Sequence, residues 1–212
     1  MKRRFLSHLL TMLMVSASGL LALPASAADE AADVLIKRLS TDMLDTIKAD
    51  KAIQAGDMAR IIALVDAKIM PNVDFQRMTA SAVGPAWRQA TPEQQKRLQE
   101  EFKTLLVRTY AGALTQVSDQ TIAVRPLRAA PEDKEVVVRS EVKGRGDAIQ
   151  LDYRLEKTPG DGAGWKIYNL NVLGVWLMET YRSQFSQEIN AKGINGLITT
   201  LTERNKANAK KG

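Results

Sequence analysis

The side chains that most often carry catalysis or bind metals are nearly absent from this sequence. Its 212 residues contain one histidine, His8, and no cysteine. His8 lies in an N-terminal segment that we expect to be removed. Triads that use His, zinc sites with His or Cys ligands, and thiol nucleophiles are therefore excluded from the remaining chain. An enzyme built on this sequence would depend on carboxylates, Lys, Ser or Tyr alone.

The candidate acidic residues lie on two predicted strands, with Glu141 on one and Asp152 and Glu156 on the next. Apolar residues occupy the alternate positions of both strands, so these carboxylates are predicted to point outward. An active site of the isomerase type, in a cone-shaped α+β fold, needs a carboxylate on the inward face of a strand. The pattern disfavours this alternative, and we predict that the protein is not an enzyme.

Glycine-rich segments can bind phosphate, and one such segment spans residues 159–164. Phosphate-binding loops of the P-loop type continue into a lysine and a serine or threonine and open a helix. Here no Lys-Ser pair follows, and both flanking segments have the pattern of strands. The segment is therefore predicted to be a hairpin turn.

The strands that must position these residues follow from the spacing of apolar side chains. Period-two alternation predicts four antiparallel strands in a meander, over residues 121–127, 135–143, 148–157 and 165–172. The alternation of the last strand changes phase near Tyr168, which indicates a β-bulge. Gly174 breaks that strand, and residues 175–178 are expected to run directly into an apolar helix.

Helical periodicity surrounds the strands on both sides. It predicts helices over residues 29–51, 57–70 and 91–117, a short helix after Pro71, a helix from residue 178 to 189, and a last one after Gly193. Thr91 and Gln94 form a capping box at the start of the longest helix. Residues 203–212 are polar and basic and are predicted to fray. The predicted fold class is α+β, with one face of the sheet exposed to solvent and the other covered by helices. A single domain is predicted over residues 28–212.

The first 27 residues have the pattern of a secretory signal peptide. Lys2, Arg3 and Arg4 precede an apolar run, and Ala-Ser-Ala at residues 25–27 predicts cleavage after Ala27. A membrane anchor is the alternative, but polar residues interrupt the run. The net charge is +6 for the whole chain and would be +3 after cleavage. This mild charge gives no indication of a nucleic-acid partner.

Two segments carry a resemblance to a known family: VGPAWRQATPEQQKRLQEEFKTLLVRTYAGAL at residues 83–114 and WKIYNLNVLGVWLMETYRSQF at residues 165–185. They resemble the MlaC family, the periplasmic phospholipid-binding component of a lipid-asymmetry system and of a toluene-tolerance ABC transporter. The order of elements matches over essentially the whole chain. Two positions depart from the family pattern. Asn169 stands where Asp is frequent, and Trp176 stands where a small residue is usual.

The resemblance implies a twisted antiparallel sheet wrapped by helices, NTF2-like or cone-like, around a deep apolar cavity. It implies a periplasmic monomer without a cofactor that holds the tails of a diacyl phospholipid. It also implies two partners, an outer-membrane lipoprotein complex and an inner-membrane ABC transporter complex, between which lipid is shuttled. The alternatives are a binding module for another apolar ligand and an adaptor with a closed core.

The candidate wall of such a cavity consists of inward apolar residues of the sheet, the longest helix and the strand-to-helix junction. They are Phe102, Leu106, Tyr110, Ile149, Leu151, Tyr153, Val175, Met178 and Tyr181. Aliphatic, Met and Tyr side chains suit the adaptable wall of an apolar pocket. The pattern does not distinguish wall from ordinary core for any single one of them.

Overall fold

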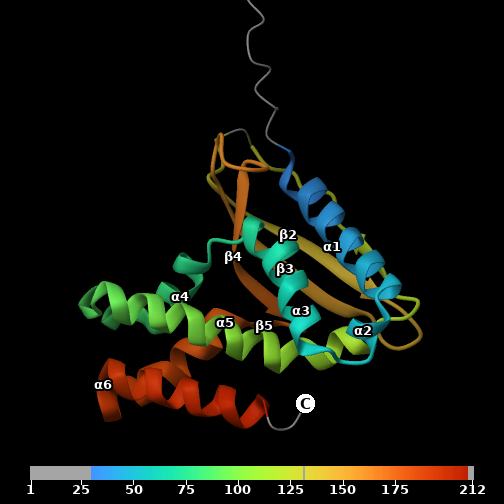
Figure 1. Cartoon of the computed structure of the whole chain (residues 1–212). Coiled ribbons are helices and arrows are strands. Elements are labelled where there is room, and N and C mark those ends of the chain that lie inside the picture. Colours follow the sequence, from blue (N-terminus) through green and yellow to red (C-terminus); the bar gives the residue numbers. More distant parts are fainter. Residues whose placement is uncertain (1–29, 131, 210–212) are drawn as a thin grey trace, which may run out of the picture.

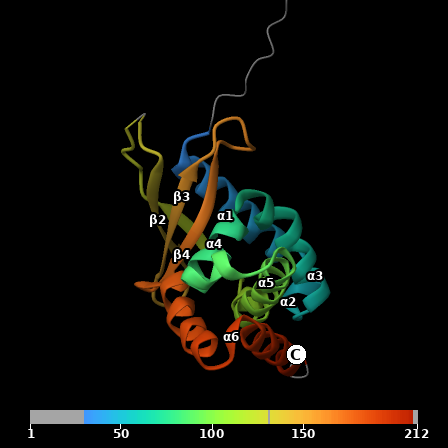
Figure 2. The same ribbon diagram turned by 90° about the vertical axis from the view of Figure 1, so that its left-hand side faces the viewer.

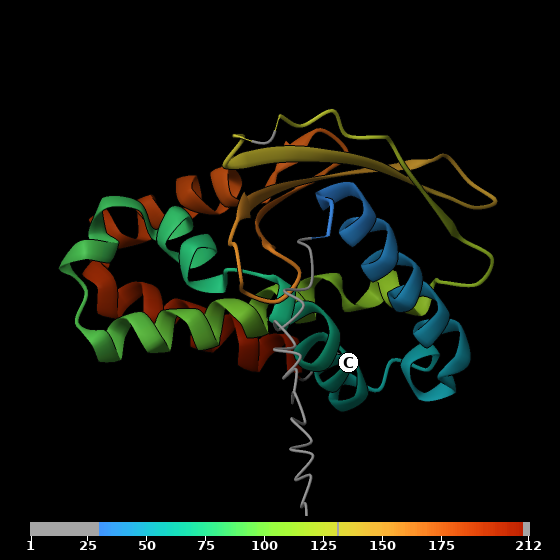
Figure 3. The same ribbon diagram turned by 90° about the horizontal axis from the view of Figure 1, so that it is seen from above.

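A computed structural model of the chain describes residues 30–130 and 132–209. The predicted signal peptide lies outside these residues. A curved antiparallel sheet forms one side of the molecule and helices lie on the other (Figures 1 and 3). Figure 2 shows the sheet from its edge, with the helices stacked against one face. The fold is α+β, as predicted.

Five α-helices precede the sheet: α1 (Ala32–Ala49), α2 (Lys51–Gln54), α3 (Met58–Leu64), α4 (Phe75–Val83) and α5 (Pro92–Thr115). The helix predicted over residues 57–70 stays α-helical only to Leu64. It continues as a π turn, Val65–Ile69, and a 3-10 turn, Met70–Asn72. A further 3-10 segment, Gly84–Gln89, joins α4 to α5. No helix of the described part of the chain is long and apolar enough to cross a membrane.

The capping box predicted at the start of α5 is confirmed. The Gln94 backbone N–H donates to the Thr91 hydroxyl at 3.3 Å, and the Thr91 N–H donates to the Gln94 side-chain oxygen at 2.9 Å. Two backbone donors that have no partner inside the helix are thereby satisfied. This cap fixes the start of the helix that runs beneath the sheet in Figure 1.

The sheet has five strands in sequence order, one more than predicted. They are β1 (Thr121–Val124), β2 (Glu135–Lys143), β3 (Ile149–Lys157), β4 (Trp165–Val172) and β5 (Val175–Trp176). β5 pairs with the end of β4, with Val175 opposite Val172. The prediction that residues 175–178 run directly into a helix is wrong for its first two residues, because Leu173 and Gly174 turn the chain back onto β4. Both have positive φ, 52° and 87°, as a tight primed hairpin turn requires.

The bulge predicted in β4 is confirmed. Leu155 of β3 pairs with Ile167 and the adjacent Arg154 pairs with Asn169, so Tyr168 is the extra residue. The Tyr168 hydroxyl donates to a Glu135 carboxylate oxygen at 3.0 Å. The bulge thus turns an aromatic side chain toward the acidic start of β2.

The last helix, α6 (Leu177–Ala209), bends at Gly193, whose φ is 70°. Its second half lies alongside α5 (Figure 1). The frayed tail predicted from residue 203 is wrong for the described residues, because α6 continues to Ala209 and Asn205 is buried. The Asn205 side-chain amide donates to the Glu101 carbonyl at 2.9 Å and to its carboxylate at 2.6 Å. These hydrogen bonds attach the end of α6 to α5. The apolar periodicity of the sequence gives no sign of them, because both side chains are polar.

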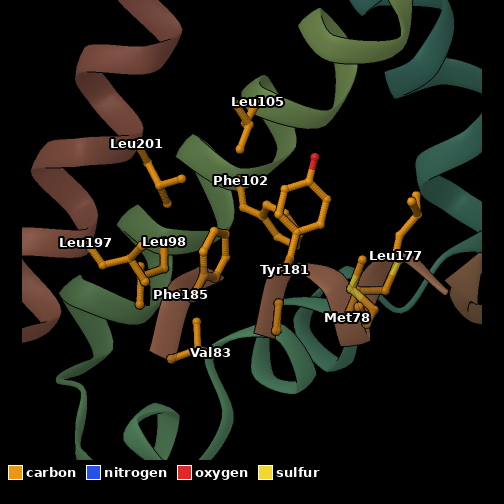
Figure 4. Close-up of a cluster of buried hydrophobic side chains, with 12 residues drawn as sticks. Met78, Val83, Leu98, Phe102, Leu105, Leu177, Tyr181, Phe185, Leu197 and Leu201 are labelled. Atoms are coloured by element: carbon orange, nitrogen blue, oxygen red, sulfur yellow. The ribbon is translucent and has the colours of Figure 1, made fainter. Parts of the chain in front are cut away.

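Buried apolar side chains of the described residues form three separate clusters. The largest joins α4, α5 and α6 and contains Leu98, Phe102, Tyr181, Phe185 and Leu201 (Figure 4). The second joins the first half of α1 to β2, β3 and β4. The third joins the end of α1 to α2, α3 and the second half of α5. Most domains have one contiguous core with smaller satellites. Val73 packs against both the first and the second cluster and links these two.

Candidate functional site

The covered face of the sheet, called here the inner face, carries the side chains predicted to point inward. Strand register places Val138 opposite Tyr153 and Val136 opposite Leu155. At the end near Leu155, the inner face is closed by α1, and Val138 and Leu155 have no exposed surface. This end of the inner face is ordinary packed core.

The other end of the inner face is less covered. Leu151 and Tyr153 are only half-buried, and Ile149 is 44% exposed. All three alternate along β3 on the same face as the fully buried Leu155. Coverage of the inner face therefore decreases along this strand, from Leu155 and Tyr153, which pack in or against the second cluster, to Ile149, which is exposed.

Tyr153 shows that this surface is partly enclosed. Burial raises the pKa of its hydroxyl, although the neighbouring Ser40 and Ser140 hydroxyls lower it. The side chain nevertheless keeps accessible surface. Tyr153 also packs against the second cluster, so it lies at the boundary between the packed core and the less covered end of the inner face.

The predicted residues of α5 fall into two groups. Leu106 is half-buried and Tyr110 is 38% exposed, so both retain apolar surface that could contact a ligand. Phe102 is fully buried, and its ring centroid lies 4.9 Å from that of Tyr181 in an edge-to-face arrangement (Figure 4). Phe102 belongs to the packed core of the largest cluster.

The junction residues are also divided between core and surface. Met178 and Tyr181 are buried in the same cluster as Phe102, and burial raises the pKa of Tyr181 to about 12. Val175 is 52% exposed on the edge strand β5, next to Leu173, which is 64% exposed. Of the predicted residues, five keep accessible surface on α5 or β3, namely Leu106, Tyr110, Ile149, Leu151 and Tyr153. Leu106 packs against the largest cluster and Tyr153 against the second, and the Tyr110 hydroxyl lies beside that of the buried Tyr181.

The three carboxylates considered for catalysis lie on the opposite, outer face of the sheet, as predicted. Glu141 pairs with Arg125 at 2.7 Å, and Glu156 pairs with Arg77. Asp152 is 6% exposed rather than solvated, and one of its oxygens accepts a hydrogen bond from the Gln150 amide at 2.8 Å. The described residues contain no group of three or more His, Cys, Asp or Glu placed to hold a metal ion.

Two pockets open elsewhere on the molecule. One, of about 160 Å³, lies where the outer face meets α4 and α6 and is lined by residues that include Arg154, Met178 and Arg182. The other, of about 580 Å³, lies between α3, the second half of α5 and the end of α6. Apart from Met178, neither is lined by a predicted wall residue. Sequence periodicity could not reveal them, because each is formed by elements distant in the sequence.

Comparison with known proteins shows which family this chain is similar to. The family model "MlaC protein" matches residues 37–203. The chain is 30% identical over 198 residues to the toluene tolerance protein ttg2D of Pseudomonas putida, covering 90% of this chain and 89% of that protein. It is 22% identical over 171 residues to the intermembrane phospholipid transport system binding protein MlaC of Haemophilus influenzae, covering 80% of each.

A solved structure is similar over nearly its whole length. It is the phospholipid-binding protein from Ralstonia solanacearum in complex with a phospholipid, with 48% sequence identity and a TM-score of 0.80. The match covers 84% of this chain and 98% of that one. By sequence and by fold, this chain belongs to the MlaC family.

Proposed function

We propose that this protein is a periplasmic phospholipid carrier that holds the acyl chains of a diacyl lipid against the inner face of its sheet. The observation that carries the proposal is the 48% identity and shared fold with a protein whose structure contains a phospholipid. The half-covered apolar end of the inner face supports it from this chain's own residues. Contiguous apolar surface without packing partners usually marks a binding site.

The proposed wall is formed by the accessible apolar residues of β3 and α5. They are Leu106, Tyr110, Ile149, Leu151 and Tyr153. Acyl chains between the sheet and α5 would lie between the three buried clusters, where protein side chains leave the inner face incompletely covered. In this proposal the lipid contributes to the packing of the interior.

The energetics of transfer agree with a carrier. Burying about 30 methylenes from water is worth on the order of 24 kcal/mol at about 0.8 kcal/mol each, a gain that would prevent release into water. A phospholipid comes from a bilayer, however, where its acyl chains are already removed from water. Exchange between two apolar environments is close to neutral. Loading and release then depend on contact with a donor or acceptor, which we propose to be outer-membrane lipoprotein and inner-membrane ABC transporter complexes.

Extraction of lipid from the purified protein tests the proposal. Protein exported to a bacterial periplasm is purified without detergent, denatured and extracted, and the extract is analysed by mass spectrometry. We expect diacyl phospholipid at close to one lipid or more per protein. Absence of stoichiometric lipid, or recovery of single-chain amphiphiles alone, would contradict the proposal. A control protein of similar size from the same preparation measures adventitious lipid.

A further inference from the structure

The pocket of about 580 Å³ shares no residue with the proposed phospholipid wall. Its lining comes from the loop before α3, from α3, from the second half of α5 and from the end of α6. In Figure 1 the end of α6 lies on the side of α5 away from the sheet. A volume of this size is within the range of pockets that bind small organic molecules.

One face of α5 keeps the pocket open. Arg108, Gly112 and Thr115 line it at spacings of four and three residues, which places them on the same side of the helix. A Cβ atom added to Gly112 would meet no other atom within 4 Å. Ile61 and Ala111, both buried, also line the pocket and provide apolar surface. Small side chains above an apolar base thus form this site.

Arg108 gives the pocket an unused positive charge. Its Nε atom is buried and has no hydrogen-bond partner within the described residues. No carboxylate of those residues lies within ion-pair distance of its guanidinium, and no Asp or Glu lines the pocket. Arg108 is half-buried and only its Nε is buried without a partner, so the guanidinium remains accessible from the pocket. A hydrogen bond from this guanidinium to an anion is stronger than one between neutral groups. The remaining polar groups of the lining, the Thr109 and Thr115 hydroxyls and the Asn208 amide, are neutral.

We propose that this pocket is a second ligand site, which binds a singly charged oxyanion carried on an aliphatic body. Arg108 would pair with the carboxylate or phosphate group, and the neutral hydroxyls would bind its other oxygens. Met58 and Ile61 would contact the aliphatic part. One unpaired guanidinium matches one negative charge, and the apolar base disfavours a small hydrated ion. The site does not depend on phospholipid being the cargo of the inner face.

Calorimetric titration of the purified protein, with its bound lipid retained, tests this site. The probes are decanoate and methyl octyl phosphate, a diester with a single negative charge, which distinguish a carboxylate from a phosphate, with decanol as the uncharged comparison. Arg108→Gln removes the charge, and Gly112→Leu places a side chain in the open space, where an added Cβ meets no atom within 4 Å. Gly146→Leu is the matched control, because Gly146 also has nothing within 4 Å of an added Cβ but lies in the β2–β3 turn. Circular dichroism verifies that each variant is folded.

We expect saturable binding of at least one anionic probe at one site, weaker by about tenfold or more in Arg108→Gln and in Gly112→Leu. Gly146→Leu should bind as the unaltered protein does, and mass spectrometry should find the same phospholipid content before and after titration. Four results would overturn the proposal: no saturable binding of either anion, equal binding by decanol, unchanged affinity in Arg108→Gln, or release of phospholipid by the probe. The last would place the probe at the inner face.

Discussion

Two leucines on the same face of β3 provide a direct test of where the lipid wall ends and the packed core begins. Leu151 is half-buried, whereas Leu155 has no exposed surface and packs against α1 and the neighbouring strands. The proposed perturbation is the same substitution at both positions, Leu151→Asp and Leu155→Asp. The strand, the residue types and the introduced charge are then identical, and only the surroundings differ.

The expected magnitudes follow from these surroundings. Replacing a fully buried leucine by a small residue costs about 2–5 kcal/mol, and an unpaired buried polar group adds about 1–3 kcal/mol. Leu155→Asp would therefore lose an amount comparable to the whole stability of a domain, about 5–15 kcal/mol. Leu151 is only partly exposed, so most of its burial energy is present and its loss is about 1–2.5 kcal/mol. The new carboxylate can remain hydrated if the bordering space admits water.

Thermal unfolding by circular dichroism and lipid extraction are measured on the same preparations. We expect Leu155→Asp to unfold or to be recovered in low yield. Leu151→Asp should remain folded but should lose bound phospholipid, because acyl chains cannot solvate a carboxylate. Leu151→Met, which preserves apolar character and approximate volume, is the control and should keep its lipid.

Two results would refute the reasoning. A folded Leu151→Asp protein with full lipid occupancy would show that acyl chains do not contact this part of β3. An unfolded Leu151→Asp protein would show that Leu151 belongs to the closed core, with no internal space beside it. The Leu155→Asp result separates these outcomes from a general intolerance of the strand to charge.

Three further predictions concern stability, each measured by urea unfolding. Burial raises the pKa of Tyr181 from 10.0 to about 12, so the stability from its neutral hydroxyl is present below pH 10 and is lost as the pH rises toward 12. Tyr181→Phe should reduce that alkaline loss by up to about 2–3 kcal/mol, and an unchanged pH profile would contradict this. Leu173→Asn should stabilise by about 0.5–1 kcal/mol, since asparagine tolerates the left-handed conformation, and destabilisation would count against it. Asn205→Ala should cost about 1.5–3 kcal/mol because it removes hydrogen bonds to Glu101, whereas a cost below about 0.5 kcal/mol would show that they contribute little.

Local chemistry explains which parts of the fold could be predicted from the sequence. The capping box at Thr91 and the bulge at Tyr168 involve residues close together in the chain, so their patterns are complete in a short segment. The meander of β1 to β4 follows from alternation and turns for the same reason. These features require no knowledge of which distant element lies opposite.

The missed features depend on contacts between distant segments. A strand of two residues, Val175–Trp176, is too short to show alternation, and only its pairing with β4 defines it. The helical end around Asn205 has a polar composition, and its burial depends on Glu101, which is 104 positions away. Alternation predicts the face on which Asp152 lies, but it does not show that this carboxylate is only 6% exposed.

The candidate site could also be predicted only in part, because it too depends on contacts between distant segments. Periodicity identified inward apolar residues but treated Leu151 and Phe102 alike, although one is half-buried and the other fully buried. Whether such a residue is wall or core depends on how closely α1 and α5 approach it. The Arg108 pocket was missed because its lining comes from segments that lie far apart in the chain.

The division of the interior into three clusters has a mechanical consequence. Enlarging a continuous close-packed core separates side chains from one another, at a cost that grows with the volume created. Here the clusters are joined through only a few elements: α1 and α5 run between clusters, and β4 and Val73 contact both the first and the second. Long helices bend gently at little cost. We therefore expect that small shifts at these shared elements let the protein accept the acyl chains of the proposed lipid at different lengths without repacking any one core.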